Sequence, residues 1–201
     1  TSVDLFTNIE TKKEEEIKAG EKEMKNNIIG RKSEQDTLAR IYESRQSEFV
    51  AVCGRRRVGK TFLVREYFEQ EMVFQTSGLA GGNTQEQLKN FFYTLRRYDR
   101  NVTSVPHDWL DAFEMLITYL DSLNGIERKV IFLDELPWMD TAGSNFISAL
   151  EHFWNGWASA RRDIVLIVCG SATSWMMDKL INNHGGLYGR LTHRLFLQPF
   201  S

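Results

Sequence analysis

Eight consecutive residues, Gly54 to Thr61 (GRRRVGKT), are of the types that bind phosphate groups. They fit the pattern G-x-x-x-x-G-K-[ST] at every fixed position. Glycines at both ends let the backbone turn its N–H groups toward phosphate oxygens, and a following helix adds the partial positive charge of its N-terminus. Lys60 is expected to reach the β- and γ-phosphates, and the Thr61 hydroxyl to ligate Mg²⁺. The segment therefore predicts a nucleoside triphosphate site.

The variable positions of this loop hold three arginines and a valine. We expect the side chains of Arg55, Arg56 and Arg57 to point outward, to solvent or to a neighbouring subunit, while the backbone from Gly54 to Phe62 surrounds the phosphates. The residues expected to contact nucleotide are Gly54, Arg55, Arg56, Arg57, Val58, Gly59, Lys60, Thr61 and Phe62.

Polar side chains also follow two other apolar runs. Asp134 and Glu135 come directly after Val130–Leu133. A phosphate loop needs a carboxylate on the metal side at a neighbouring strand end, which is the role expected for Asp134, and Glu135 is then able to orient or deprotonate the attacking water. Ser171 follows the run Ile164–Cys169. It is expected to bind the γ-phosphate or the water, or to cap the helix that follows.

These residues need a scaffold of alternating strands and helices, which is what the hydrophobic pattern predicts. The order favours an α/β fold whose sheet is mostly parallel and covered by helices on both faces. Expected strands are Phe49–Cys53, Met72–Gln75, Val130–Leu133, Ile164–Val168 and Arg194–Leu197. Expected helices are Glu34–Ser44, Lys60–Glu69, Thr84–Tyr98, Asp108–Leu123, Ser144–Ala160 and Trp175–Asn182.

Helix starts and buried faces can be predicted in three places. Ser33 is the expected N-cap of the first helix, with Leu38 and Ile41 facing inward. Thr84 and Gln87 have the spacing of a capping box. In the helix after Asp108, helical spacing places five residues on the buried face: Leu110, Phe113, Leu116, Ile117 and Leu120.

Composition limits the class of protein. The 201 residues suit one α/β domain, and the 25 basic and 27 acidic residues nearly cancel. Residues 1–26, with 7 acidic and 5 basic residues, are expected to form a charged arm or helix, which leaves residues 27–201 neutral. Bulk charge thus gives no support for nucleic acid as a partner. The two cysteines indicate buried thiols, and the lack of an 18-residue apolar run favours a cytoplasmic protein without membrane contact.

The motifs GRRRVGKT, VIFLDE and VCGS, in this order and spacing, resemble the AAA+ branch of the phosphate-loop ATPases. The segment Ile28–Glu34 is similar to the box on the adenine side of the nucleotide, with Ile29 and Gly30 as contacts. The runs LDELPWM, GSATSWMMDKL and GGLYGRLTHRLFLQPF resemble the prokaryotic "archaeal ATPase" family. The resemblance covers residues 27–201.

This resemblance implies a three-layer α/β/α fold with a parallel five-strand sheet in the order 5-1-4-3-2, and ATP or ADP with Mg²⁺ at the strand ends. Lys60 and Thr61 match the phosphate-loop pair, Asp134 and Glu135 the metal and water carboxylates, and Ser171 the polar sensor. Family members continue into a small helical lid, so residues 27–201 are expected to be a core truncated before its lid.

The resemblance also implies a partner. Arg190 matches the arginine with which AAA+ proteins act on the nucleotide of a neighbouring subunit, so a homo-oligomer is expected. Arg194 is the competing candidate, and for either residue a salt bridge at a helix end is the plain alternative.

The motifs together predict a Mg²⁺-dependent, ATP-hydrolysing module that couples nucleotide state to conformational change or assembly. One alternative is a signalling or scaffold switch that is gated by nucleotide and hardly hydrolyses it. A kinase of small metabolites is less favoured, because the pair Asp134 and Glu135 suits activation of water and no acceptor-binding element is visible. The protein effector is not identified by sequence.

Overall fold

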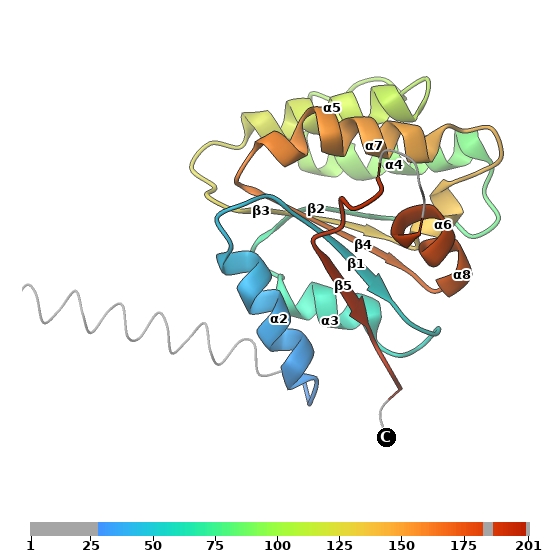
Figure 1. Cartoon of the computed structure of the whole chain (residues 1–201). Coiled ribbons are helices and arrows are strands. Elements are labelled where there is room, and N and C mark those ends of the chain that lie inside the picture. Colours follow the sequence, from blue (N-terminus) through green and yellow to red (C-terminus); the bar gives the residue numbers. More distant parts are fainter. Residues whose placement is uncertain (1–27, 183–186, 200–201) are drawn as a thin grey trace, which may run out of the picture.

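The computed structural model describes residues 28–182 and 187–199, in which five strands form one parallel sheet (Figure 1). The strand order is β2-β3-β4-β1-β5, and every neighbouring pair is parallel. Read from the other edge this is 5-1-4-3-2, so the predicted order is confirmed. The strands are β1 (Glu48–Cys53), β2 (Met72–Ser77), β3 (Lys129–Asp134), β4 (Ile164–Gly170) and β5 (His193–Phe196).

The three central strands are buried along their whole length, as continuous apolar runs predict. Successive side chains of a strand point to opposite faces, so each strand contributes to two cores. In β1, Val50 and Val52 pack in the core under α2 and α3, whereas Phe49 and Ala51 pack in the larger core under α4, α5 and α7. The sheet is therefore the middle of three layers, as predicted.

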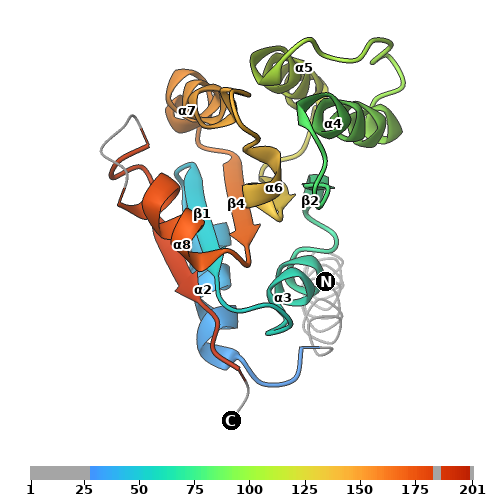
Figure 2. The same ribbon diagram turned by 90° about the vertical axis from the view of Figure 1, so that its right-hand side faces the viewer.

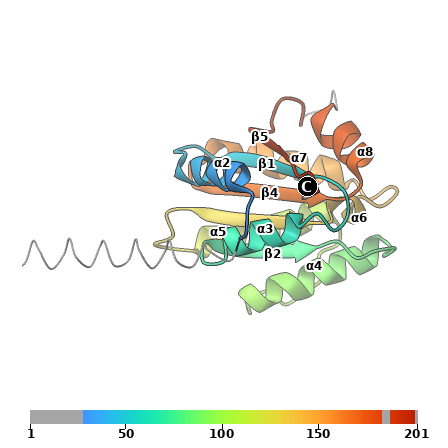
Figure 3. The ribbon, with the colours of Figure 1, turned by 90° about the horizontal axis from the view of Figure 1, so that it is seen from below.

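Helices cover both faces of the sheet, with α4, α5 and α7 on one face and α2 and α3 on the other (Figures 1 and 3). The longer helices are α2 (Lys32–Glu43), α3 (Lys60–Tyr67), α4 (Thr84–Tyr98), α5 (Trp109–Ser122) and α7 (Phe146–Gly156). Shorter helical segments are α6 (Leu136–Met139), the 3₁₀ turn η2 (Ala158–Ala160), α8 (Thr173–Met176) and the π turn η3 (Met177–Ile181).

The start of α4 differs from its prediction by one residue. Asn83, not Thr84, is the N-cap: its side chain accepts from the backbone N–H of Glu86, and the Glu86 carboxylate accepts from the N–H of Asn83. Gln87 is buried and binds the preceding loop instead, through both the N–H and the carbonyl of Leu79. The expected capping box was therefore wrong, because Gln87 has a tertiary role.

Two other helix predictions also need correction. Helix α2 begins at Lys32 with Arg31 as its N-cap, so Ser33 lies inside the first turn, although Leu38 and Ile41 are fully buried as expected. In α5 Leu110 is 45% exposed and Trp109 is buried in its place, because the inward face follows Trp109, Ala112, Phe113 and Leu116. The helix expected over Trp175–Asn182 is α8 followed by the π turn η3.

The predicted charged segment, residues 1–26, lies outside the described residues. Within the ranges that are described, no helix combines the length and apolarity required to cross a bilayer.

Lys129, Arg161 and Asp163 form an ion cluster that joins the starts of β3 and β4. We expect its contribution to the free energy of unfolding to be lost in acid. Asp163 accepts from Arg161 Nε at 2.8 Å and from Lys129 Nζ at 2.7 Å. Hydrogen bonds from Arg161, reinforced by Lys129, outweigh burial and hold the pKa of Asp163 well below its usual range. The folded protein thus keeps Asp163 ionised at pH values where the unfolded chain, whose aspartate pKa is about 4, takes up a proton.

We expect Asp163→Asn to lower the free energy of unfolding by about 1–3 kcal/mol at pH 7. The difference from the parent should be fully present above pH 4 and should shrink as the pH falls below it, because there only the unfolded parent binds the extra proton. Urea unfolding of both proteins at pH 7, 4 and 3 measures this. A difference that is constant across this range would contradict the assignment.

Candidate functional site

The loop between β1 and α3 needs two glycines for different physical reasons. Gly54 has φ 147°, and a Cβ there would lie 2.5 Å from the carbonyl oxygen of Leu197, the residue after β5. Gly59 has φ 85° and is the N-cap of α3. Both positive φ values disfavour other residues, so the loop can curl around the N-terminus of α3 only with glycine here. The free N–H groups and dipole of that terminus favour an anion.

Lys60 is the first residue of α3 and its side chain folds back over the loop. It is 6% exposed, and its ammonium group donates to the carbonyls of Gly54 and Arg55, both at 2.8 Å. In the part of the chain that the structure describes, no carboxylate lies within ion-pair distance of Lys60. The buried positive charge is thus held by neutral acceptors and remains available to an anionic ligand.

Thr61 and Asp134 meet although 73 positions separate them in the chain. The Thr61 hydroxyl donates to Asp134 Oδ2 at 2.7 Å, and the other carboxylate oxygen accepts from the N–H of Glu135 at 2.9 Å. Asp134 is buried at the end of β3. A hydroxyl and one carboxylate beside a phosphate loop suit Mg²⁺, which usually takes few protein oxygens and keeps phosphate and water ligands. The donor set therefore fits the metal that the motif implies.

Glu135 is held in an unusual backbone conformation just after β3. Its φ is 47°, in the left-handed region, and it precedes the short helix α6. Its carboxylate accepts from the Ser171 hydroxyl at 3.2 Å, which joins the ends of β3 and β4. The structure thus brings together the acidic residue and the polar strand end that the sequence indicated.

Two glycines let α6 pack against the strand ends. A Cβ on Gly78 would lie 2.6 Å from the Glu135 carbonyl oxygen, and a Cβ on Gly170 would lie 2.8 Å from Pro137 Cδ. Both distances are too short for ordinary contacts, so these glycines let Glu135 and α6 approach β2 and β4. Sequence reasoning missed this role, although each glycine directly follows or ends a strand run.

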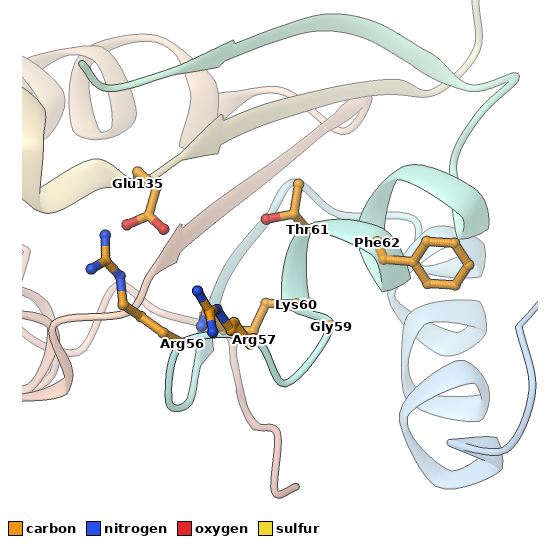
Figure 4. A pocket seen from close by; sticks show the side chains of 7 residues that line it. All are labelled: Arg56, Arg57, Gly59, Lys60, Thr61, Phe62 and Glu135. Carbon is orange, nitrogen blue, oxygen red and sulfur yellow. The ribbon is translucent and has the colours of Figure 1, made fainter. Parts of the chain in front are cut away.

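A cavity of about 830 Å³ opens between the loop and the ends of the strands. Figure 4 shows the guanidinium group of Arg56 reaching toward the Glu135 carboxylate, with Thr61 across the cavity and the Phe62 ring turned away. The lining residues are Arg56, Arg57, Gly59, Lys60, Thr61, Phe62 and Glu135. All three loop arginines are exposed, as expected, but two of them also line the cavity and make it cationic.

Other residues expected at the nucleotide lie further from this cavity. Ile29 is 87% exposed and Gly30 is exposed, and neither lines it. Val58 is buried beneath the loop, and Arg55 is exposed but not among the lining side chains. Arg190 is exposed, and its backbone N–H donates to the carbonyl of Leu187 and closes a turn. The Arg190 side chain does not line the cavity either.

Arg31 connects segments that the sequence did not link. Its guanidinium group donates to the carbonyls of Val58 at 2.8 Å and Gln198 at 2.7 Å, and it pairs with Glu34 at 3.2 Å. The contacts tie the start of α2 to the phosphate loop and to the chain after β5. Because they join positions up to 167 residues apart, no local sequence signal could have revealed them.

The two cysteines are free thiols beside the site. Cys53 and Cys169 are both buried, as predicted. Burial raises the pKa of Cys53 to about 11, and burial together with the nearby Asp134 raises that of Cys169 further. Both thiols are protonated at neutral pH, so they act as packing groups rather than nucleophiles.

The AAA domain family matches residues 42–175. An uncharacterized protein of Methanocaldococcus jannaschii, MJECL04, is 26% identical over 172 residues, which are 86% of this chain and 36% of that protein.

Two solved structures share the fold. The Walker-type ATPase PABY2304 of Pyrococcus abyssi superposes with a TM-score of 0.65 at 18% identity, over 88% of this chain and 55% of that one. A chain in the structure of Drosophila ORC bound to DNA superposes with a TM-score of 0.63 at 16% identity, over 92% of this chain and 47% of that one. The chain spans about half or less of the length of these proteins. By the family match, by its strand order and by its phosphate loop, this chain belongs to the AAA domain family of P-loop ATPases.

Proposed function

We propose that this chain is a Mg²⁺-dependent AAA+ module that binds ATP and hydrolyses it to ADP and phosphate. The observation that carries the proposal is the convergence of Lys60, the bonded pair Thr61 and Asp134, and Glu135 around one cationic cavity. These residues come from two segments, the start of α3 and the end of β3, and 73 positions separate Thr61 from Asp134.

In this mechanism the phosphate loop holds the β- and γ-phosphates through its backbone N–H groups, and Lys60 leaves its two carbonyl acceptors to bind them. Thr61 and Asp134 would hold Mg²⁺, which neutralises charge on the phosphate oxygens when bound. Ile29 and Gly30 would lie on the adenine side. Arg56, which reaches into the cavity, adds positive charge near the γ-phosphate.

Glu135 is proposed to position the attacking water and to take its proton. Its carboxylate borders the cavity and is oriented by the Ser171 hydroxyl at 3.2 Å. One oxygen, Oε2, is engaged by Ser171, so the other is free to accept from a water in the cavity. Attack in line with the leaving oxygen breaks the bond between the β- and γ-phosphoryl groups and releases ADP.

A direct test is phosphate release by the purified chain from ATP, with Mg²⁺ or with EDTA and without any added acceptor. Mg²⁺-dependent release supports the ATPase. Tight nucleotide binding without release would instead favour a nucleotide-gated switch. In that case the assembly size, measured with ADP and with a non-hydrolysable ATP analogue, should differ.

Gly78→Ala tests how Glu135 is positioned. The added Cβ would meet the Glu135 carbonyl oxygen at 2.6 Å and Trp138 Cβ at 2.9 Å, so the segment that carries the carboxylate must move. We expect turnover to fall about tenfold, since a displacement of about 1 Å can cost up to a hundredfold. ATP affinity should stay within a few fold, as measured by fluorescence titration.

The control for this variant is Gly156→Ala. Gly156 ends α7, and the nearest atom to an added Cβ is His152 Cε1 at 3.8 Å. This change should leave turnover as in the parent and stabilise slightly, because alanine favours helix. Equal turnover in the two variants would contradict the positioning role of Gly78.

Arg190 is proposed to act on the nucleotide of a neighbouring subunit. Its exposure, its distance in sequence from the loop and its absence from the lining of the cavity in its own chain support a role in trans. Turnover per chain should then rise with protein concentration, and Arg190→Ala should remove that rise. The same measurement on Arg194→Ala, which alters the competing exposed arginine on β5, should leave the rise intact.

A further inference from the structure

A second cavity lies at the open edge of the sheet, where β2 runs between α3 and α4. Figure 2 shows β2 at one edge of the sheet, with α4 above it and α3 below. The cavity measures about 310 Å³, the lower end of the range of about 300–1,000 Å³ for ligand pockets. It shares no lining residue with the cavity at the phosphate loop.

Two arginines from different helices border this cavity. Arg65 comes from α3 and Arg97 from the last turn of α4, and both are exposed. Across residues 28–182 and 187–199, neither guanidinium group has an ion pair or a hydrogen bond. No carboxylate lines the cavity. Two unpaired guanidinium groups at one polar cavity favour an anion with several oxygens.

Two residues that line the cavity, Gln75 and Thr76, have a buried side-chain oxygen without a hydrogen-bond partner among the described residues. Thr76 is 6% exposed and its hydroxyl makes no hydrogen bond, and the side-chain oxygen of Gln75 is also buried and unpaired. Buried polar groups are nearly always paired, so the unpaired Thr76 hydroxyl beside two arginines favours a ligand that accepts hydrogen bonds. The Gln75 oxygen is itself an acceptor and adds no support for an anion. The neighbouring hydroxyl groups of Ser77 and Tyr98 can donate further hydrogen bonds, whereas the Thr94 hydroxyl already donates to the carbonyl of Asn90 at 2.8 Å.

The strand edge itself is closed to another strand. The Tyr119 hydroxyl donates to the carbonyl of Val73 at 2.9 Å, and the Asn90 amide donates to the carbonyl of Ser77 at 2.8 Å. These two side chains occupy acceptors that an added peptide strand would need. The cavity therefore suits a compact ligand that is recognised by side chains.

We propose that this edge cavity is a binding site for a small phosphate monoester. A dianionic phosphoryl group has enough acceptor oxygens for both arginines and for the hydroxyl donors, whereas a carboxylate has only two oxygens. The proposal does not depend on ATP hydrolysis, because none of the residues that line this cavity is among those proposed to hold the triphosphate. The two sites share helix α3, which carries Thr61 near its start and Arg65 one turn later.

The test is a titration of the folded chain with inorganic phosphate and, separately, with AMP, at fixed ionic strength, followed by backbone amide NMR. Binding at the edge cavity should shift the resonances of Gln75, Thr76 and Ser77. Binding at the phosphate loop would shift those of Gly59 to Thr61, so the two sites are read separately. Tighter binding of AMP than of phosphate would identify an ester as the ligand, and equal binding would identify the free ion.

Arg65→Ala and Arg97→Ala should each weaken binding at the edge cavity about tenfold, the loss expected for one hydrogen bond to a charged group. The matched control is Arg96→Ala, which removes the adjacent charge on α4 but not a lining residue. Arg96→Ala should bind as the parent does. Shifts confined to the phosphate loop, equal losses in all three variants, or tighter binding of a single-stranded oligonucleotide than of AMP would overturn the proposal.

Discussion

Lys60→Ala is expected to weaken ATP binding about 100-fold, which corresponds to about 2.7 kcal/mol. Lys60 is 6% exposed, and among the described residues its ammonium group is held only by the carbonyls of Gly54 and Arg55. A buried charge in such a site interacts strongly with phosphate. Removing one partner of a close, buried charge pair typically costs about 2–5 kcal/mol of binding free energy. Calorimetric titration with ADP and with a non-hydrolysable ATP analogue measures the change.

The control for this change lies in the same loop. Arg55→Ala also removes one positive charge, but the Arg55 side chain is exposed and does not line the cavity. Its affinity should stay within about twofold of the parent, because long-range attraction between exposed charges is screened by salt. If both variants bind nucleotide as the parent does, the proposed site is wrong.

The second large effect concerns turnover. Glu135→Gln should lower the rate of ATP hydrolysis by 100-fold or more, about the contribution of a general base, while ATP affinity changes little. An amide oxygen can still accept from Ser171, so the geometry at the ends of β3 and β4 is kept while the ability to take a proton is lost. Single-turnover measurements at saturating ATP separate this loss from slow product release.

Glu114→Gln is the matched control, since Glu114 is exposed on α5 and lies away from the cavity. It should hydrolyse ATP as the parent does. A Glu135→Gln variant that keeps more than about a third of the parental rate would show that another group activates the water. Thermal unfolding of each variant checks that the fold is intact.

Much of the scaffold could be predicted because the relevant signals are local. The central strands are continuous apolar runs, and only burial on both faces of a sheet accommodates such runs. The phosphate loop is a contiguous pattern with fixed spacing, and its glycines adopt the positive φ values that the pattern requires. The meeting of Glu135 with Ser171 also follows, because the carboxyl ends of parallel strands share one edge of the sheet.

Errors occurred where a local signal competed with tertiary contacts. Gln87 has the spacing of a capping residue, yet its side chain stabilises the loop from Leu79 to Gly82. Leu110 fits a helical stripe, yet Trp109 fills the core because it packs edge-on against Phe91 and Phe146. Hydrophobic spacing does not distinguish such neighbouring residues, whereas the shape of the core does.

The order and type of the elements, the phosphate loop and the identity of the acidic pair could be inferred from the amino-acid sequence alone. These depend on periodicity and on side-chain chemistry that neighbouring residues specify. Three features became visible only in the folded chain: Arg31 joins the loop to Gln198, Gly78 and Gly170 make room for α6, and Arg65 and Arg97 border one cavity. The physical reason is that these contacts form between segments far apart in the chain, whose approach is set by packing of the two cores rather than by local preference.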